Sequence, residues 1–111
     1  MAFTTIHVAA DLDAASRRRA RRSGPRAVAS RAGTSQLLRS AGFVDVEAVD
    51  ITEAFMETAR AWIAERSRHA ADLAPLGPAG EFEERQRGSR RQLAATEDGL
   101  LRRSMFFATR P

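Results

Sequence analysis

The sequence predicts an α/β fold, in which three strands alternate with helices along a chain of 111 residues. Short runs rich in β-branched and aromatic residues occupy residues 2–8, 43–51 and 100–109, and such runs are typical of strands. The segments between them carry apolar residues at helical spacing and end at glycine or proline. Strands separated by helices usually join one parallel sheet, so we expect a single sheet of three strands.

The first predicted strand, residues 2–8, has apolar residues that do not alternate with charges, which suits a strand covered on both faces. Two short helices are expected after it. Asp11 or Asp13 can cap the first of them by accepting a backbone N–H. Thr34 can cap the second, which is expected to stop at Gly42.

Residues 43–51 show the clearest strand pattern, because apolar and acidic side chains alternate up to Ala48. The alternation shifts after Ala48, which predicts a β-bulge or a fully buried end. Thr52 then begins a long helix and can cap it. Its apolar side chains at helical spacing predict a buried stripe that comprises Phe55, Ala59, Trp62, Ile63, Ala70 and Leu73.

Residues 73–80 are predicted to be a linker, since prolines and glycines dominate them. A second and more polar helix is expected over residues 81–97, where Phe82 and Leu93 are the only large apolar side chains. A helix with so little to bury is usually a surface element or a lid. The last strand, residues 100–109, is expected to be buried on both faces.

Composition excludes several classes of protein. Hydrophobic residues make up 43% of the chain, which argues against disorder, and the absence of cysteine excludes disulfides, thiolate zinc sites and cysteine nucleophiles. No run of 18 apolar residues is present and residues 1–13 do not read as a signal peptide. We therefore expect a cytoplasmic protein with no membrane association.

All 18 basic residues are arginines, and residues 1–40 carry a formal charge of +6. Seven arginines fall within residues 17–31 and could contact the phosphates of a nucleic acid. No aromatic residue interleaves them, so stacking on unpaired bases is unsupported. The absence of lysine and the abundance of alanine also fit a GC-rich coding bias. We therefore expect the arginine segment to be a solvated surface rather than a nucleic-acid site.

Three segments together resemble Rossmann-like S-adenosylmethionine-dependent methyltransferases. QLLRSAGFVDVEAVDI, residues 36–51, resembles the junction between a helix and strand six of these enzymes. GLLRRSMFFATRP, residues 99–111, is similar to their last strand, which runs antiparallel and is expected to close the sheet edge. AFTTIHVA, residues 2–9, is similar to strand five. The two helices before the last strand resemble an insertion that some members place over the substrate pocket.

The resemblance implies that residues 1–111 are the C-terminal portion of such an enzyme, from strand five onward. The glycine-rich E/D-x-G-x-G loop that holds the cofactor does not occur here, so no residue can be assigned to S-adenosylmethionine binding. The family transfers a methyl group to a small molecule. We expect this fragment alone to be inactive, to bind no cofactor, and to lack an upstream half.

Three residues are candidates for the substrate pocket, while the catalytic residues stay unknown. His7 lies near the carboxyl end of the first strand and can act as a base or as a hydrogen-bond partner. Its alternative is a partly exposed histidine without a role. Trp62 and Phe82 can form aromatic walls of a pocket, although core packing is the alternative for Trp62. His7 and His69 are too far apart in sequence to suggest a metal site.

A different class of function also fits the sequence. A partial sheet exposes the unpaired edge of its first strand, and such an edge can pair with another chain. The protein would then be an interaction module, or an inactive half that complements a cofactor-binding chain, or a protein that self-associates through this edge.

Overall fold

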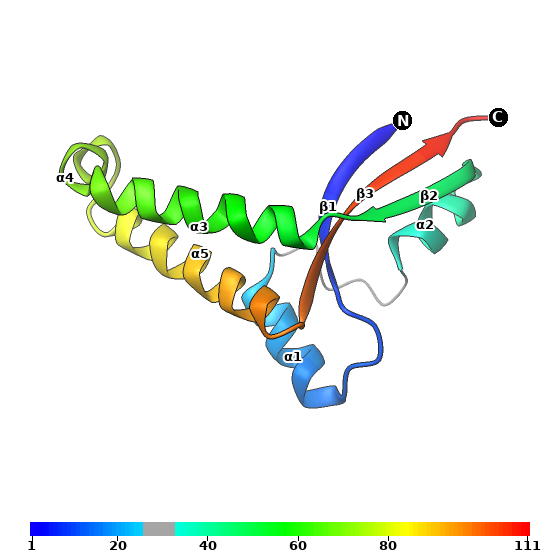
Figure 1. Ribbon diagram of the computed structural model, residues 1–111, viewed down its shortest axis with the longest axis horizontal. Helices are drawn as coiled ribbons and strands as arrows, with labels where there is room; N and C mark the ends of the chain where they lie inside the picture. The colour runs from blue at the N-terminus through cyan, green and yellow to red at the C-terminus, as the bar shows by residue number, and fades with distance from the viewer. Residues whose placement is uncertain (26–32) are drawn as a thin grey trace.

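Three strands form one antiparallel sheet in the computed structural model, which describes residues 1–25 and 33–111 (Figure 1). The order is β1–β3–β2, with β1 at Ala2–Val8, β2 at Val44–Asp50 and β3 at Leu101–Thr109. Because β3 runs antiparallel to both neighbours, β1 and β2 run parallel to each other without touching. The predicted α/β class and the three strands are confirmed, whereas the parallel pairing expected from the alternation of strands and helices is wrong, because both strand pairs are antiparallel.

The position of the last strand differs from the expectation. β3 runs antiparallel, as expected, but it lies in the centre of the sheet and not at its edge. β2 carries Asp45, Glu47 and Asp50, and charged side chains suit an edge strand. β3 contributes the buried Phe106 and Ala108, so the most apolar strand takes the position with a neighbour on each side.

Two short helices follow β1 and precede β2. These are α1, Ala14–Ser23, and α2, Thr34–Ser40. Asp13 caps α1 as predicted, since its carboxylate accepts the Ser16 N–H at 2.7 Å. α2 instead has Gly33 at its N-cap, and Thr34 is its first helical residue, so the predicted Thr34 cap is wrong. The hydrogen bond at Asp13 also agrees with its lowered pKa, whose first cause is the Ser16 backbone N–H.

The two long helices pack side by side and project away from the sheet (Figure 1). They are α3, Thr52–Arg68, and α5, Glu81–Glu97. The long helix was expected to reach Leu73, but it ends at Arg68 and is followed by a separate short helix, α4, Ala70–Leu73. At the tip of the pair the predicted linker contains a short 3-10 helix, η2, Ala74–Leu76. The bounds of α5 agree with the predicted second helix.

The start of α3 is built differently from the prediction. Thr52 does not cap the helix, because its hydroxyl group accepts the Arg103 N–H at 3.0 Å and donates to the Arg103 carbonyl at 3.3 Å. Asp50 takes over the first helical N–H, that of Thr52, at 2.9 Å. The Thr52 hydroxyl thus makes the two hydrogen bonds to the backbone of β3 that a further residue of β2 would otherwise make. The Thr52 side chain is also among the largest fully buried side chains.

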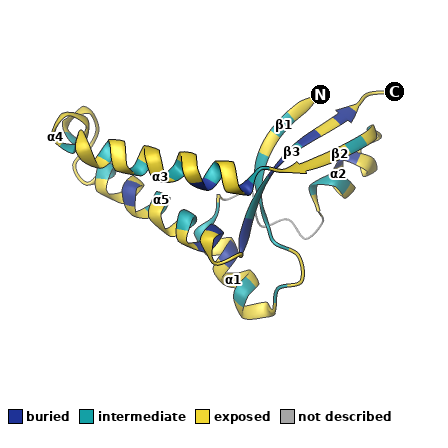
Figure 2. Ribbon diagram, viewed as in Figure 1, coloured by how far each residue is buried: buried dark blue, intermediate teal, exposed yellow. Residues whose placement is uncertain are grey.

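The core consists of two small clusters, one on each side of the sheet's central region. The first joins Ala20, Ala95, Leu100 and Leu101. The second joins Leu38, Phe106 and Ala108. Figure 2 shows that burial concentrates on β3 and on the helix ends next to it, while the outer turns of α3 are largely exposed.

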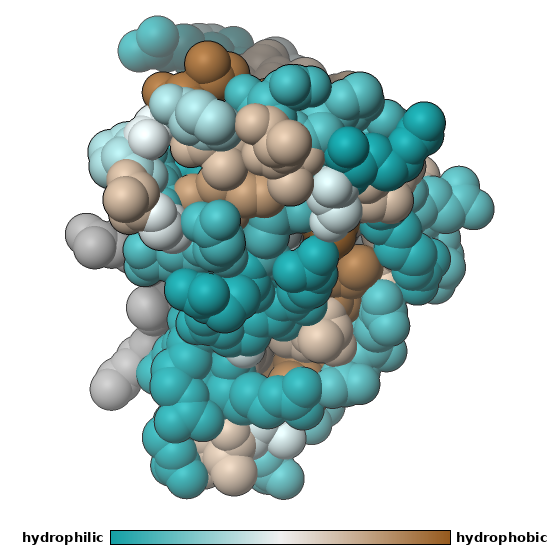
Figure 3. Space-filling view, turned by 90° about the vertical axis from the view of Figure 1, so that its left-hand side faces the viewer, coloured by the Kyte–Doolittle hydropathy of each residue, from teal (hydrophilic) through white to brown (hydrophobic). Residues whose placement is uncertain are grey.

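The molecule is elongated for its length. Its radius of gyration is 16.2 Å and its extents are 49 × 32 × 25 Å, whereas a compact chain of this length has a radius of gyration of about 13 Å. The end of the helical pair presents mainly hydrophilic residues, with apolar ones in separate patches (Figure 3). None of the helices in residues 1–25 and 33–111 is long and apolar enough to cross a membrane.

Two burial predictions are wrong for related reasons. Trp62 and Leu73 were expected in the buried stripe of the long helix, yet they are 60% and 37% exposed. Beyond the sheet, α3 has α5 as its packing partner, so only the Met56 side of α3 becomes buried. β3 was expected to be buried on both faces, but Phe107 is 37% exposed while Phe106 and Ala108 are buried.

The predicted bulge in β2 exists at another place. The register shifts between Val44 and Glu47, before Ala48 rather than after it. Asp45 has a φ of 51°, a left-handed conformation that aspartate tolerates better than most residues. The side-chain alternation read from the sequence is therefore interrupted near the start of the strand.

Candidate functional site

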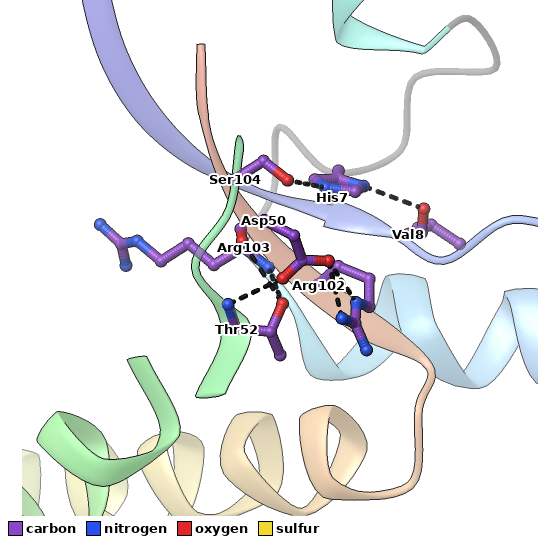
Figure 4. Close-up of polar contacts among 7 residues, drawn as sticks. All are labelled: His7, Val8, Asp50, Thr52, Arg102, Arg103 and Ser104. Atoms are coloured by element: carbon purple, nitrogen blue, oxygen red, sulfur yellow. Dashed lines mark hydrogen bonds and ion pairs between the residues drawn. The ribbon is translucent and has the colours of Figure 1, made fainter. Parts of the chain in front are cut away.

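Polar side chains gather where β1 and β2 end and β3 begins (Figure 4). Because β1 and β2 run parallel, their carboxyl ends lie at the same edge of the sheet, which is where ligands bind in open α/β sheets. We call this group the polar cluster, and it comprises the side chains of His7, Asp50, Thr52, Arg102 and Ser104 with the backbone of Arg103, whose side chain points away toward Thr4.

His7 points toward Ser104 across the β1–β3 pair. Its Nε2 lies 3.0 Å from the Ser104 Oγ, and its Nδ1 lies 3.3 Å from the carbonyl oxygen of Val8. A carbonyl oxygen can only accept, so Nδ1 carries a proton. When the ring is neutral, Nε2 is its basic nitrogen and accepts from the Ser104 hydroxyl.

The surroundings of this pair limit its chemistry. Ser104 is only 5% exposed, and the Phe106 ring meets the His7 ring edge-on at 6.2 Å between centroids. His7 is half-buried, so part of its ring is open to a bound molecule, while Nε2 faces the buried Ser104 hydroxyl. A neutral imidazole in this position can accept a proton from a ligand hydroxyl or amine.

Asp50 anchors the other half of the polar cluster. Its Oδ1 accepts the Thr52 N–H at 2.9 Å, and its Oδ2 accepts Nε and Nη2 of Arg102 at 2.9 and 2.6 Å. Partial burial acts to raise the pKa of Asp50, but the hydrogen bonds from Thr52 and Arg102 outweigh it and lower the pKa from 3.8 to about 2. Asp50 stays ionised near neutral pH, so it orders backbone and does not transfer protons.

A broad cavity opens beside His7, and we call it the His7 cavity. Its volume is about 1220 Å³, and its lining combines β1 with Ser104 and Phe106 of β3 and with residues of α1 and α2. Arg17, Arg18 and Arg21 of α1 are among the lining residues. The lining thus includes an imidazole and three positively charged side chains, a combination that favours a small anionic molecule.

The three predicted pocket residues do not meet. His7 lines the cavity just described, whereas Phe82 lines a separate cavity of about 760 Å³ between α1, η2 and α5. Trp62 lines neither cavity, and the Arg66 guanidinium lies over its ring at 5.9 Å from the centroid. The structure therefore does not bring these three residues to one cavity, and their role in a substrate pocket stays a prediction.

Sequence reasoning missed Ser104, the partner of His7. The two residues are 97 positions apart, and only the register of β1 on β3 brings them to one face of the sheet. The one signal in the sequence was a polar residue inside the apolar run SMFFA. The predicted arginine segment is seen only in part, because residues 26–31 lie outside the described residues.

Comparisons with known proteins give no family. No protein-family model matches the chain, and no curated protein matches its sequence. Within the part of the chain that the structure describes, no group of three or more histidine and acidic side chains can hold a metal ion. The function is therefore argued from the fold, the polar cluster and the cavities alone.

Proposed function

We propose that this chain is the C-terminal part, from strand five onward, of a Rossmann-like S-adenosylmethionine-dependent methyltransferase with a small-molecule acceptor. The observation that carries the proposal is the reversed last strand between two parallel strands. In the strand numbering of the resemblance, β1, β2 and β3 correspond to strands five, six and seven. The last strand is then the reversed one, as the resemblance implies, although it lies between the other two strands and not at the sheet edge.

The free edge of β1 supports the proposal as well. Among the described residues β1 pairs only with β3, so its other edge has unpaired backbone groups. β1 has the sequence AFTTIHV, without a formal charge or a proline to protect that edge. The opposite edge strand, β2, has three acidic residues. An uncharged edge such as that of β1 is expected for a strand inside a larger sheet, where a further strand would cover it, whereas the charged edge of β2 suits the end of a sheet.

The residues of this chain do not fit the cofactor itself. Close approach of backbone to S-adenosylmethionine needs a glycine-rich loop after a strand, whereas the loop after β1, residues 9–13, contains no glycine. The glycines with positive φ, Gly42, Gly80 and Gly99, lie in turns at helix ends. We therefore assign cofactor binding to another part of the complete enzyme.

This chain's contribution would be the acceptor side. His7 would take the proton of an acceptor hydroxyl or amine, with its Nδ1–H held on the Val8 carbonyl. Arg17, Arg18 and Arg21, which line the same cavity, would hold an anionic group of the acceptor. Catalysis by orientation needs few groups beyond these.

The test is to express the chain together with the sequence encoded directly upstream of it, and to titrate S-adenosylmethionine by calorimetry. Saturable binding by the longer product, and none by residues 1–111, is the expected result. Saturable micromolar binding by residues 1–111 would contradict the proposal, and so would a longer product that binds none. With radiolabelled cofactor, His7→Ala should lower methyl transfer at least tenfold, whereas His69→Ala on the exposed end of α3 should not.

The second candidate is an interaction module, and the unprotected β1 edge also favours it. A chain of this kind would pair its β1 with a strand of another molecule and would bind no cofactor in any form. The calorimetric test separates the two candidates, because only the methyltransferase predicts binding by the longer product.

A further inference from the structure

We propose that the cavity lined by Phe82 binds a small organic anion that has an apolar body and a hydrogen-bond donor. We call it the helical cavity. It has a volume of about 760 Å³ between α1, η2 and α5, which is within the usual range for small-molecule sites. It shares no lining residue with the His7 cavity, so the site goes beyond the proposed methyltransferase and does not rest on it.

Gln86 supplies the strongest evidence. It lines the helical cavity and is only 3% exposed. Its Nε2 donates to the Ile63 carbonyl at 3.2 Å and to the Ser67 Oγ at 3.1 Å. Its Oε1 is buried and has no hydrogen-bond partner among the described residues. A buried acceptor without a partner costs about 1–3 kcal/mol, so a ligand N–H or O–H group that reaches this oxygen would be bound favourably.

The charges around the helical cavity indicate the sign of the ligand. Arg22 from α1, Arg66 from α3 and Arg91 from α5 line it. None of these three arginines takes part in an ion pair between described residues. The one acidic residue in the lining, Glu81, is already bound by Arg85 at 2.9 Å. Three guanidinium groups from three helices therefore favour a carboxylate, sulfonate or phosphate.

Apolar side chains complete the lining. The Phe82 ring is half-buried, and Leu73 and Leu76 at the tip of the helical pair are exposed, Leu76 to 81%. Exposed leucines beside a cavity can cover the apolar part of a ligand. The combination selects a molecule with an anionic group, a donor and an aromatic or aliphatic body.

The test uses 8-anilinonaphthalene-1-sulfonate, because it combines a sulfonate, an amine N–H and aromatic rings. Its fluorescence is titrated with the whole chain at low and high salt. The double variant Arg22→Ala/Arg91→Ala, which removes two exposed side chains, is expected to weaken binding at least tenfold. Arg87→Ala on the same helix as Arg91 is the matched control, because Arg87 is exposed and does not line the cavity.

Two more variants locate the binding. Gln86→Met keeps the apolar volume but removes the acceptor, and it is expected to weaken the probe several-fold. Arg18→Ala/Arg21→Ala removes charge from the His7 cavity and is expected to leave the affinity within twofold. Equal affinity in all variants, or a loss confined to Arg18→Ala/Arg21→Ala, would overturn the proposal. Since no cofactor is present, this outcome is independent of the methyltransferase test.

Discussion

Asp50 and Arg102 form a two-point contact in which one carboxylate oxygen accepts both Nε and Nη2 of the guanidinium, at 2.9 and 2.6 Å. The other carboxylate oxygen accepts the first N–H of α3, that of Thr52. One side chain thus connects the end of β2, the start of β3 and the first turn of α3 (Figure 4). The direction in which the helical pair leaves the sheet depends on this connection.

Replacing Asp50 should therefore destabilise the fold. Asp50→Ala removes the acceptor of the Thr52 N–H together with the ion pair, and we expect a loss of about 1–2 kcal/mol in the free energy of unfolding. Glu47→Ala is the control, because Glu47 lies exposed on the same strand and takes part in no ion pair between described residues. Urea denaturation measures both, and equal effects of the two substitutions would contradict the role given to Asp50.

The same carboxylate predicts a dependence of stability on pH. The pKa of Asp50 is lowered from 3.8 to about 2 in the folded state, so the folded state binds its proton less readily than the unfolded state does. Its stabilisation is present above about pH 4 and is lost as pH falls toward 2. Because the Asp50 side chain is nearly half exposed, solvent screening limits the effect to about 1 kcal/mol.

Asp50→Asn isolates this contribution, since it keeps the shape and cannot titrate. The stability difference between the parent chain and Asp50→Asn should shrink between pH 4 and pH 2, as measured by urea denaturation at each pH. A difference that stays constant over this interval would show that Asp50 does not carry the lowered pKa.

Gly88 lies inside α5, where a β-carbon would meet open space. Gly88→Ala should therefore raise the free energy of unfolding by about 0.5–1 kcal/mol, because alanine restricts the unfolded chain and favours the helix. Gly99→Ala should have the opposite sign, since Gly99 has a φ of 77° that alanine adopts poorly. Thermal melts of the two variants test both signs, and a destabilised Gly88→Ala would mean that the helix is strained there.

Local signals in the sequence predicted local structure well. The Asp13 cap, the bounds of the helix over residues 81–97 and the three strand positions are confirmed. These features depend on residues within a few positions of one another. His7 was also placed correctly at the end of a strand next to a cavity.

Features that depend on distant partners could not be predicted. β3 takes the central position because it is more apolar than β2, whose acidic side chains suit a strand at the sheet edge. This position follows only when the two strands are compared, and not from either strand alone. The exposure of Trp62 depends on how few elements pack on α3. Ser104 lies beside His7 only because of the β1–β3 register. A shift of that register by one residue would turn the side chains of one strand to the other face of the sheet.

The unprotected edge of β1 yields the last prediction. This strand carries no formal charge, and its outer edge is unpaired among the described residues, so the chain is expected to self-associate at micromolar concentration. Thr4 is exposed near the middle of β1, and its hydroxyl accepts a hydrogen bond from Arg103. A glutamate there keeps an acceptor for Arg103, while two glutamates would repel each other across an antiparallel β1–β1 pair. Thr4→Glu should therefore shift the chain to a monomer without lowering its melting temperature.

Thr58→Glu, which adds the same charge to an exposed position of α3, should leave the association unchanged. Sedimentation equilibrium over a range of concentrations measures both, and a parent chain that stays monomeric, or equal association in both variants, would count against pairing through β1.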